Sequence, residues 1–194
     1  MHESFLQHIR SFIDITEEEG EKILSFFTFK KYKKKTNLLH AGEVCRFEAF
    51  VIKGCIKTCF IDKNGFDVIL TFATENWWVS DIASFQQEKP SQMWIETIED
   101  CELLMINQAN KEKLLQTFPV MEKMFRLLVQ RHLVTYQERL FGNIAMTARE
   151  RYDTFLSKYP ALPQRIPQHL IASYLGVSPE FLSRLRNKKK KPLE

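Results

Sequence analysis

The C-terminal stretch "IASYLGVSPEFLSRLRNKKKK", residues 171–191, decides the class of fold, because it contains two short helical segments joined by a tight turn. Gly176 can adopt the positive φ that the end of a helix often requires. Ser178 is a good N-cap for the second helix, and Pro179 suits the first helical position because no N–H is needed there. The stretch therefore predicts a helix pair that turns at Gly176.

Apolar and polar side chains separate onto two sides of this helix pair. The inward positions are apolar or small: Ile171, Ala172, Leu175, Val177, Leu182 and Leu185. The outward side of the second helix, with the residues that follow it, offers groups that can bond to bases or phosphates: Ser178, Glu180, Ser183, Arg184, Asn187, Lys188 and Lys189. This pattern is typical of a helix-turn-helix, whose second helix enters the DNA major groove. The alternative is an ordinary helical hairpin with a solvated polar face.

Positive charge is concentrated in the same part of the chain. The 194 residues include 28 Lys and Arg against 24 Asp and Glu, a net charge of +4. Residues 142–194 hold ten basic and four acidic residues, a balance of +6, whereas residues 1–141 carry −2. This asymmetry is the expected footprint of a phosphate-binding module. A second basic cluster, between Lys30 and Lys35, is interpreted as a solvated edge or loop.

Several classes of protein are disfavoured by what the sequence lacks. It has no apolar run of membrane-spanning length and no signal peptide, so we expect a cytoplasmic protein without a membrane partner. The cysteines have no C-x-x-C spacing and are interpreted as reduced, mostly buried thiols, which leaves no expected metal site or cofactor: Cys45, Cys55, Cys59 and Cys101. The five histidines are scattered, and no catalytic triad or phosphate-binding loop is present, so we expect neither catalytic residues nor an enzyme.

The pattern in the middle of the chain predicts short strands. Residues 3–28 are expected to be helical, with Thr16 and the three glutamates after it typical of a helix start, and the pattern changes at about residue 36. Two apolar runs flank Lys63, Asn64 and Gly65, which is a strong hairpin signal. The runs "QMWIETIED" and "CELLMIN" read as a further strand pair. Together these strands predict an antiparallel β-roll over residues 36–107 within an α+β fold.

Helical periodicity returns after the strands. The segment 119–141 is apolar on two faces, and a helix with two apolar faces has two packing partners. One face is expected to pack on the roll and the other on a second copy of the chain. The residues expected at the dimer interface are Val120, Met124, Leu127 and Val134. The alternative is a helix buried inside a single domain. A further helix, 147–158, leads to the helix-turn-helix, and the expected domains are 1–141 and 142–194.

The order of these parts resembles the Crp/Fnr family of bacterial transcription regulators. The stretch that begins "HAGEVCRFEAF" and ends at Phe72 is similar to that family's roll, with its turns at Gly42, Gly54 and Gly65. The stretch "IASYLGVSPEFLSRLRNK" is similar to the family's DNA-reading helices. The resemblance implies a cyclic-nucleotide-binding-like sensor domain, a homodimer and double-stranded DNA as partner. RNA polymerase and a small-molecule effector are further candidate partners.

The sequence also departs from the family pattern. Members that bind cyclic AMP hold the ribose and the phosphate with a Gly-Glu pair and an Arg followed by Ser or Thr. The matching positions here are the effector-pocket candidates Ser80, Asp81, Ser91 and Gln92. No arginine occurs between Phe47 and Phe125, and a buried phosphate favours a guanidinium. We therefore expect a degenerate pocket that does not bind cyclic AMP.

The end of the chain departs as well, since no clear β-hairpin wing follows the second helix. Lysines stand there instead, at positions 188–191, and two interpretations stay open. They replace the phosphate contacts of the wing, or they form a solvated tail. For the whole chain, the main hypothesis is a dimeric DNA-binding regulator. The alternative is a small-ligand or cyclic-nucleotide-binding module whose helix-turn-helix makes protein contacts.

Overall fold

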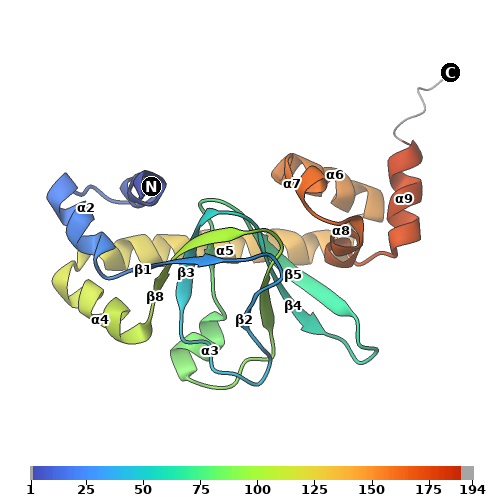
Figure 1. The fold of residues 1–194 in the computed structure, drawn as a ribbon. Coiled ribbons are helices and arrows are strands. Elements are labelled where there is room, and N and C mark those ends of the chain that lie inside the picture. Colours follow the sequence, from blue (N-terminus) through green and yellow to red (C-terminus); the bar gives the residue numbers. More distant parts are fainter. Residues whose placement is uncertain (1, 189–194) are drawn as a thin grey trace. The chain divides into compact units, whose positions relative to one another are not determined.

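The computed structural model describes residues 2–188, which fall into two compact units (Figure 1). The first unit comprises Met1–Phe60 and Thr71–Arg131, and the second comprises Ile61–Leu70 and His132–Glu194. The long helix α5, Val120–Ala145, contributes to both units. It runs through the expected domain boundary at residue 142, so that boundary stays a prediction.

The N-terminal segment forms two helices rather than one continuous helical region. Helix α1 spans Glu3–Arg10 and α2 spans Glu17–Leu24, and strand β1 already begins at Thr28. The break has a local cause at Thr16, which starts a new helix with a capping box. Its hydroxyl accepts a hydrogen bond from the Glu19 amide at 3.2 Å, and the Glu19 carboxylate accepts one from the Thr16 amide at 2.8 Å.

The strands form an antiparallel roll of two four-stranded sheets, which confirms the expected fold class. The strands are β1 Thr28–Tyr32, β2 Asn37–Leu39, β3 Glu48–Lys53, β4 Ile56–Ile61, β5 Asp67–Ala73, β6 Trp78–Val79, β7 Trp94–Thr97 and β8 Cys101–Ile106. One sheet has the order β1-β8-β3-β6 and the other β2-β7-β4-β5. Strand β1 is therefore an edge, and its exposed lysines fit the interpretation as a solvated edge.

The expected pairing of the two runs after residue 92 is wrong. Strand β7 pairs with β2 and β4, whereas β8 pairs with β1 and β3 in the other sheet. Alternating apolar residues predict strands but not their partners, which the roll topology decides. Gly54 shows how tightly the sheets approach each other where β3 passes into β4. It has a φ of +104°, and an added Cβ would lie 2.5 Å from the Cys101 sulfur.

The expected hairpin between β4 and β5 is confirmed. Asp62 and Phe66 pair across a three-residue loop, with Gly65 at a φ of +82°. The Asp62 carboxylate accepts hydrogen bonds from the amides of Asn64, at 2.8 Å, and Phe66, at 2.9 Å. These bonds fix the shape of the turn, which belongs to the second unit.

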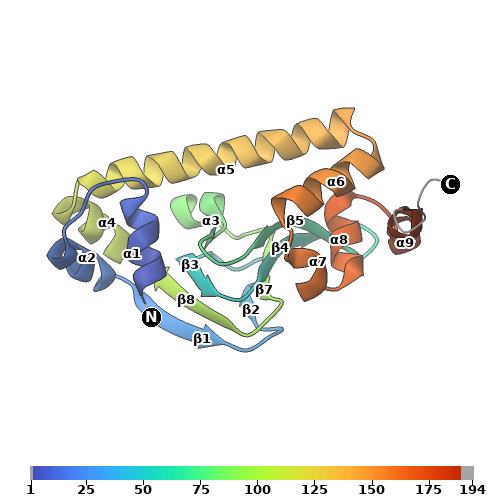
Figure 2. The ribbon, with the colours of Figure 1, turned by 90° about the horizontal axis from the view of Figure 1, so that it is seen from above.

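The core of the first unit joins the N-terminal helices to the roll and to the first half of α5 (Figure 2). Phe5 of α1 packs on Phe50 of β3, with ring centroids 5.2 Å apart. Trp78 then contacts Phe50 and Phe125, each at 5.7 Å. Helix α4, Gln108–Thr117, adds Leu114 to this cluster, and α3, Ile82–Gln87, adds Phe85 to a second cluster inside the roll. Burial of these rings is the main source of stability in this unit.

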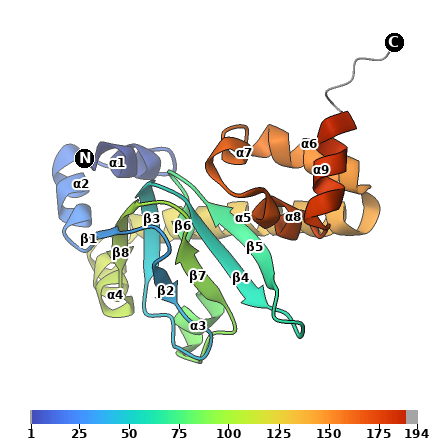
Figure 3. The ribbon, with the colours of Figure 1, turned by 45° about the vertical axis from the view of Figure 1, so that its right-hand side comes forward.

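The second unit contains four short helices after α5 (Figure 3). They are α6 Ala148–Lys158, α7 Leu162–Arg165, α8 Gln168–Leu175 and α9 Pro179–Lys188. Its core holds an aromatic group in which the Phe155 ring lies 5.4 Å from the rings of both Tyr159 and Tyr174. Throughout residues 2–188, no helix is long and apolar enough to cross a membrane.

Candidate nucleic-acid interface

The predicted helix-turn-helix is present, with the turn where the sequence indicated it. Gly176 follows α8 in the left-handed region, at φ 66° and ψ 38°. The Ser178 hydroxyl accepts a hydrogen bond from the Phe181 amide at 3.2 Å, so Ser178 is the N-cap of α9 as expected. The Val177 amide donates to the Ala172 carbonyl at 3.0 Å and closes the end of α8. Local hydrogen bonds therefore fix the angle at which α9 leaves α8.

The apolar side of the helix pair faces inward as predicted. Ala172 and Leu182 are fully buried where α8 and α9 cross. Ile171 and Leu175 are buried as well, while Val177 and Leu185 are half-buried. The packing of these small and branched side chains sets the orientation of α9, because a buried Leu makes dozens of weak contacts with its neighbours.

The opposite side of α9 is exposed. Five of the predicted DNA-contacting residues lie on it: Ser178, Glu180, Ser183, Arg184 and Asn187. Lys188 is the last residue of α9, while Lys189 and the lysines that follow it lie outside the described residues. The sequence thus placed a contiguous polar surface on the outer side of the second helix, and the structure brings its described members together.

Glu180 and Arg184 lie one helical turn apart on this surface. A hydrogen bond from its own backbone N–H is the main reason that the pKa of Glu180 lies below its usual range. The Ser178 hydroxyl and the positive charge of Arg184 act in the same direction. The Arg184 guanidinium also lies 5.7 Å from the centre of the Phe181 ring, which is 38% exposed. Both side chains are exposed and therefore accessible to a partner.

Two arginines that the sequence analysis did not single out hold the end of α8. Arg139 of α5 donates to the Tyr174 carbonyl at 3.1 Å, and Arg151 of α6 donates to the Leu175 carbonyl at 3.2 Å. Cations at a helix C-terminus satisfy its last carbonyls and its dipole. The only sequence signal for this role is that both residues are basic and precede a helix-turn-helix, which is too general to identify them.

A third missed residue, Ser173, joins α8 to the β4–β5 hairpin inside the second unit. Its hydroxyl donates to the Asp67 carbonyl at 2.6 Å and accepts from the Ile69 amide at 3.0 Å. Arg139 also donates to the Ile69 carbonyl, at 2.7 Å. Side chains from helices α5 and α8 therefore satisfy backbone groups of β5, an arrangement that no pattern within either segment predicts.

The effector-pocket candidates of the roll are only partly brought together. The Ser91 hydroxyl donates to the Asp81 carboxylate at 2.6 Å, and that carboxylate also caps α3 by accepting from the Ser84 amide at 3.1 Å. The neighbouring Ser80 hydroxyl donates to the Phe47 carbonyl at 2.9 Å. Gln92, in contrast, is exposed. Three of the four candidates, Ser80, Asp81 and Ser91, thus already make hydrogen bonds within the protein.

This arrangement offers little to a cyclic phosphate. Asp81 is 5% exposed and matches the family's glutamate, whereas Ser91, 4% exposed, stands at the position of its arginine. Lys89 contributes its backbone carbonyl, which accepts from the Ser84 hydroxyl at 2.6 Å, while its side chain is exposed.

The expected interface residues of α5 have different surroundings. Met124 is fully buried in the core of the first unit, and Leu127 packs half-buried against that core. Val120 and Val134 are 40% and 52% exposed. A separate row of exposed apolar residues follows one side of the helix at spacings of three and four: Val129, Leu133, Tyr136, Leu140 and Ile144.

Sequence comparison finds relatives among known regulators. Residues 29–118 match the family model of the cyclic nucleotide-binding domain. The cAMP-activated global transcriptional regulator CRP of Escherichia coli is 24% identical over 130 residues, 67% of this chain and 61% of the relative. CRP of Haemophilus influenzae is 29% identical over 89 residues, 46% of this chain and 40% of the relative. The chain thus matches about three fifths or less of the length of these relatives.

Solved structures share the fold over nearly the whole chain. The c-di-GMP-responsive global regulator CLP of Xanthomonas campestris has a TM-score of 0.73 at 16% identity, covering 90% of this chain and 92% of CLP. A CooA variant from Carboxydothermus hydrogenoformans has a TM-score of 0.70 at 18% identity, covering 95% of this chain and 84% of CooA. At these identities the likeness concerns the fold.

These findings confirm the resemblance to the Crp/Fnr family. Residues 29–118 match the cyclic nucleotide-binding domain, and they are followed by a long helix and a C-terminal helix-turn-helix, as in the fold of these solved structures. Its sequence relatives are transcription regulators of the CRP type.

Proposed function

We propose that the chain is a homodimeric, sequence-specific DNA-binding transcriptional regulator of the Crp/Fnr type. The exposed polar surface of α9 is the main support for this proposal. The inner side of the helix pair is capped and buried, and the outer side of α9 presents groups suited to base edges. The balance of +6 over residues 142–194 supports it, since phosphate contacts need positive charge. In this proposal residues 142–194 supply DNA binding, and residues 1–141 form the sensor and the dimerisation helix.

Arg184 is proposed as the main reader of bases. A guanidinium can donate two hydrogen bonds to O6 and N7 of guanine in the major groove. Glu180, one turn earlier, can accept from the amino group of cytosine, while Ser183 and Asn187 can reach a base or a phosphate. Lys188 and Lys189 are proposed as phosphate contacts.

The dimer is proposed to form through the exposed apolar row of α5, Val129 to Ile144, and not through the row with Met124. All five side chains of that row are at least 50% exposed, and Ile144 is 78% exposed. Their spacing follows one side of the helix, so a second copy of α5 can cover them all at once. Two copies would then place two α9 helices about one DNA turn apart, roughly 34 Å.

The roll is proposed to have lost the cyclic AMP response. The position of Ser91 supports this, because it stands where members that bind cyclic AMP hold the phosphate with an arginine, and its hydroxyl is bonded to the Asp81 carboxylate. RNA polymerase and an effector of another kind remain proposed partners of the intact dimer.

Selection of duplexes from a random DNA library tests the proposal. We expect the full chain to enrich an inverted repeat whose half-sites lie about 10 base pairs apart. Arg184→Ala should relax one base pair in each half-site, whereas Arg46→Ala, an exposed arginine of the first unit, should leave the selected sequence unchanged. A library that stays random with the wild-type chain would favour the alternative, in which the helix-turn-helix makes protein contacts.

A further inference from the structure

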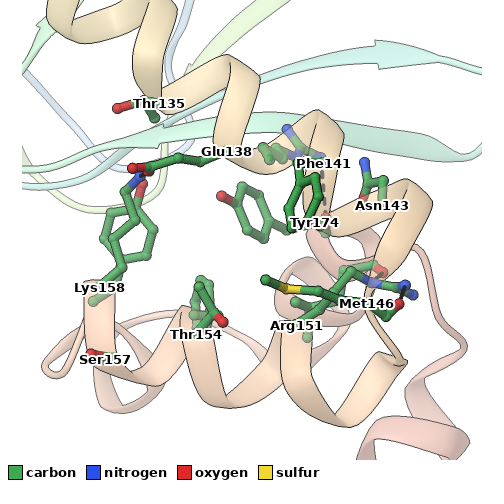
Figure 4. Close-up of a pocket in the computed structure, with 15 residues that line it drawn as sticks. Thr135, Glu138, Phe141, Asn143, Met146, Arg151, Thr154, Ser157, Lys158 and Tyr174 are labelled. Atoms are coloured by element: carbon green, nitrogen blue, oxygen red, sulfur yellow. Dashed lines mark hydrogen bonds and ion pairs between the residues drawn. The ribbon is translucent and has the colours of Figure 1, made fainter.

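A cavity of about 580 Å³ lies within the second unit, and all of its lining residues belong to that unit. Helix α5 lines it with residues between Thr135 and Asn143, and α6 and α8 supply most of the remaining wall. Figure 4 shows Glu138 and Lys158 approaching each other on one side, with Met146 and Arg151 on the other. The volume lies in the range of cavities that hold drug-sized ligands.

Four aromatic residues contribute to the wall of this cavity. Phe155, Tyr159 and Tyr174 contribute rings whose centroids lie 5.4–6.4 Å apart, and Phe141 adds a fourth ring that is 60% exposed. Rings at such separations offer faces and edges on which another ring can stack. Burial raises the pKa of both tyrosine hydroxyls, so Tyr159 and Tyr174 stay neutral at physiological pH.

The charged groups around these rings are mainly positive. Arg139, Arg151 and Lys158 line the cavity, and Glu138 is the one carboxylate among its lining residues. Glu138 is already paired with Lys158, at 3.2 Å. The two arginines donate to backbone carbonyls, which carry no full charge. The lining therefore carries an excess of positive charge that a bound anion would neutralise.

Arg139 is the group best placed to meet that anion. Its guanidinium lies 4.2 Å from the centre of the Tyr174 ring. One nitrogen, Nη2, makes both hydrogen bonds of this side chain to the described residues, to the carbonyls of Ile69 and Tyr174. Nε and Nη1 thus keep donors for a ligand. Burial lowers the pKa of Arg139, since removal of water disfavours the charged form.

We propose that this cavity binds a small aromatic anion, of the class of fused-ring carboxylates or sulfonates, through Arg139 and the tyrosine rings. The site is separate from the effector position of the roll. A ligand there would touch Tyr174 and Leu175, the last two residues of α8 before the turn to α9. It would therefore bind next to the element that sets the direction of α9.

The test is a fluorescence titration of the full chain with 8-anilinonaphthalene-1-sulfonate in the absence of DNA, so its result does not depend on the proposed function. We expect saturable binding of one probe per chain, with 2-naphthoate displacing the probe and 2-naphthamide failing to do so. Arg139→Gln should weaken binding about tenfold or more, since a charge-assisted hydrogen bond is lost. Thr154→Trp, at an exposed position of the lining, should abolish binding by filling the cavity.

Arg131→Gln is the matched control. Arg131 lies on the same helix and stacks on a ring in the same way, 4.0 Å from the centre of Phe12, but does not line the cavity. Binding should be unchanged in this variant. Equal affinity in the wild type and in both Thr154→Trp and Arg139→Gln would overturn the proposal. So would loss of binding in Leu133→Asp alone, because the probe would then lie on the exposed row of α5.

Discussion

Substitution of Leu133 by Asp should break the dimer without unfolding the chain. Leu133 lies near the middle of the exposed apolar row and is 55% exposed in the single chain. Complete burial of a leucine side chain stabilises by about 1.5–3 kcal/mol, so covering its exposed half contributes about 0.8–1.6 kcal/mol. A symmetric dimer contains the residue twice, and the loss is therefore about 1.6–3.2 kcal/mol per dimer.

This loss corresponds to a dimer Kd that rises by about 15-fold to 200-fold. Sedimentation equilibrium over nanomolar to micromolar concentrations measures it directly. The melting temperature of the dissociated chain should stay close to that of the wild-type monomer, because an exposed side chain contributes little to the core.

Met124→Ala is the control with the opposite pattern. Met124 is fully buried, so its truncation should lower the free energy of unfolding by about 2–5 kcal/mol and leave the dimer Kd of the folded chain unchanged. If Leu133→Asp sedimented as the wild type does while Met124→Ala dissociated, the dimer would use the row first indicated by the sequence, and the exposed row would have another role.

Three further outcomes are expected. Calorimetry with cyclic AMP should detect no binding tighter than about millimolar, because Ser91 stands where the family holds the phosphate with an arginine, and a micromolar Kd would contradict this reading of the pocket. Gly54→Ala should lower the melting temperature strongly, since the added Cβ would lie 2.5 Å from the Cys101 sulfur and 2.7 Å from the Asp100 carbonyl. Gly42→Ala should lower the melting temperature much less, because a Cβ added at Gly42 has no other atom within 4 Å. Burial raises the pKa of Cys101 to about 11, so its thiol should react with Ellman's reagent at pH 8 only after denaturation, and rapid reaction of the native chain at this residue would contradict the burial.

The sequence predicted the elements whose signals are local. Thr16 and Ser178 indicated helix starts, and Gly65 and Gly176 indicated turns, because capping and positive φ depend on a few neighbouring residues. The break between α1 and α2 was missed, although Thr16 lay inside the expected helical region. A capping signal was recognised there, but the preceding residues were not assigned to a loop.

Properties that depend on tertiary pairing were not predicted. The partners of β7 and β8 follow from the roll topology, which alternation along one strand does not contain. The two faces of α5 were recognised, yet Met124 was assigned to the outer face. Apolar residues occur around most of this helix, so periodicity alone does not say which ones the roll covers. The contacts of Ser173 with the hairpin join positions more than a hundred residues apart and have no local signature.

The most direct test of the central claim is the ratio of affinities for a selected operator and for random DNA, measured for the wild type and for Arg184→Ala at several salt concentrations. Sequence-specific reading by α9 predicts that Arg184→Ala loses about 1–3 kcal/mol per half-site on the operator and much less on random DNA. The salt dependence should persist in both proteins, because other basic residues still contact phosphates. If Arg184→Ala lowered both affinities equally, Arg184 would bind phosphate without reading bases, and α9 would not be the recognition helix proposed here.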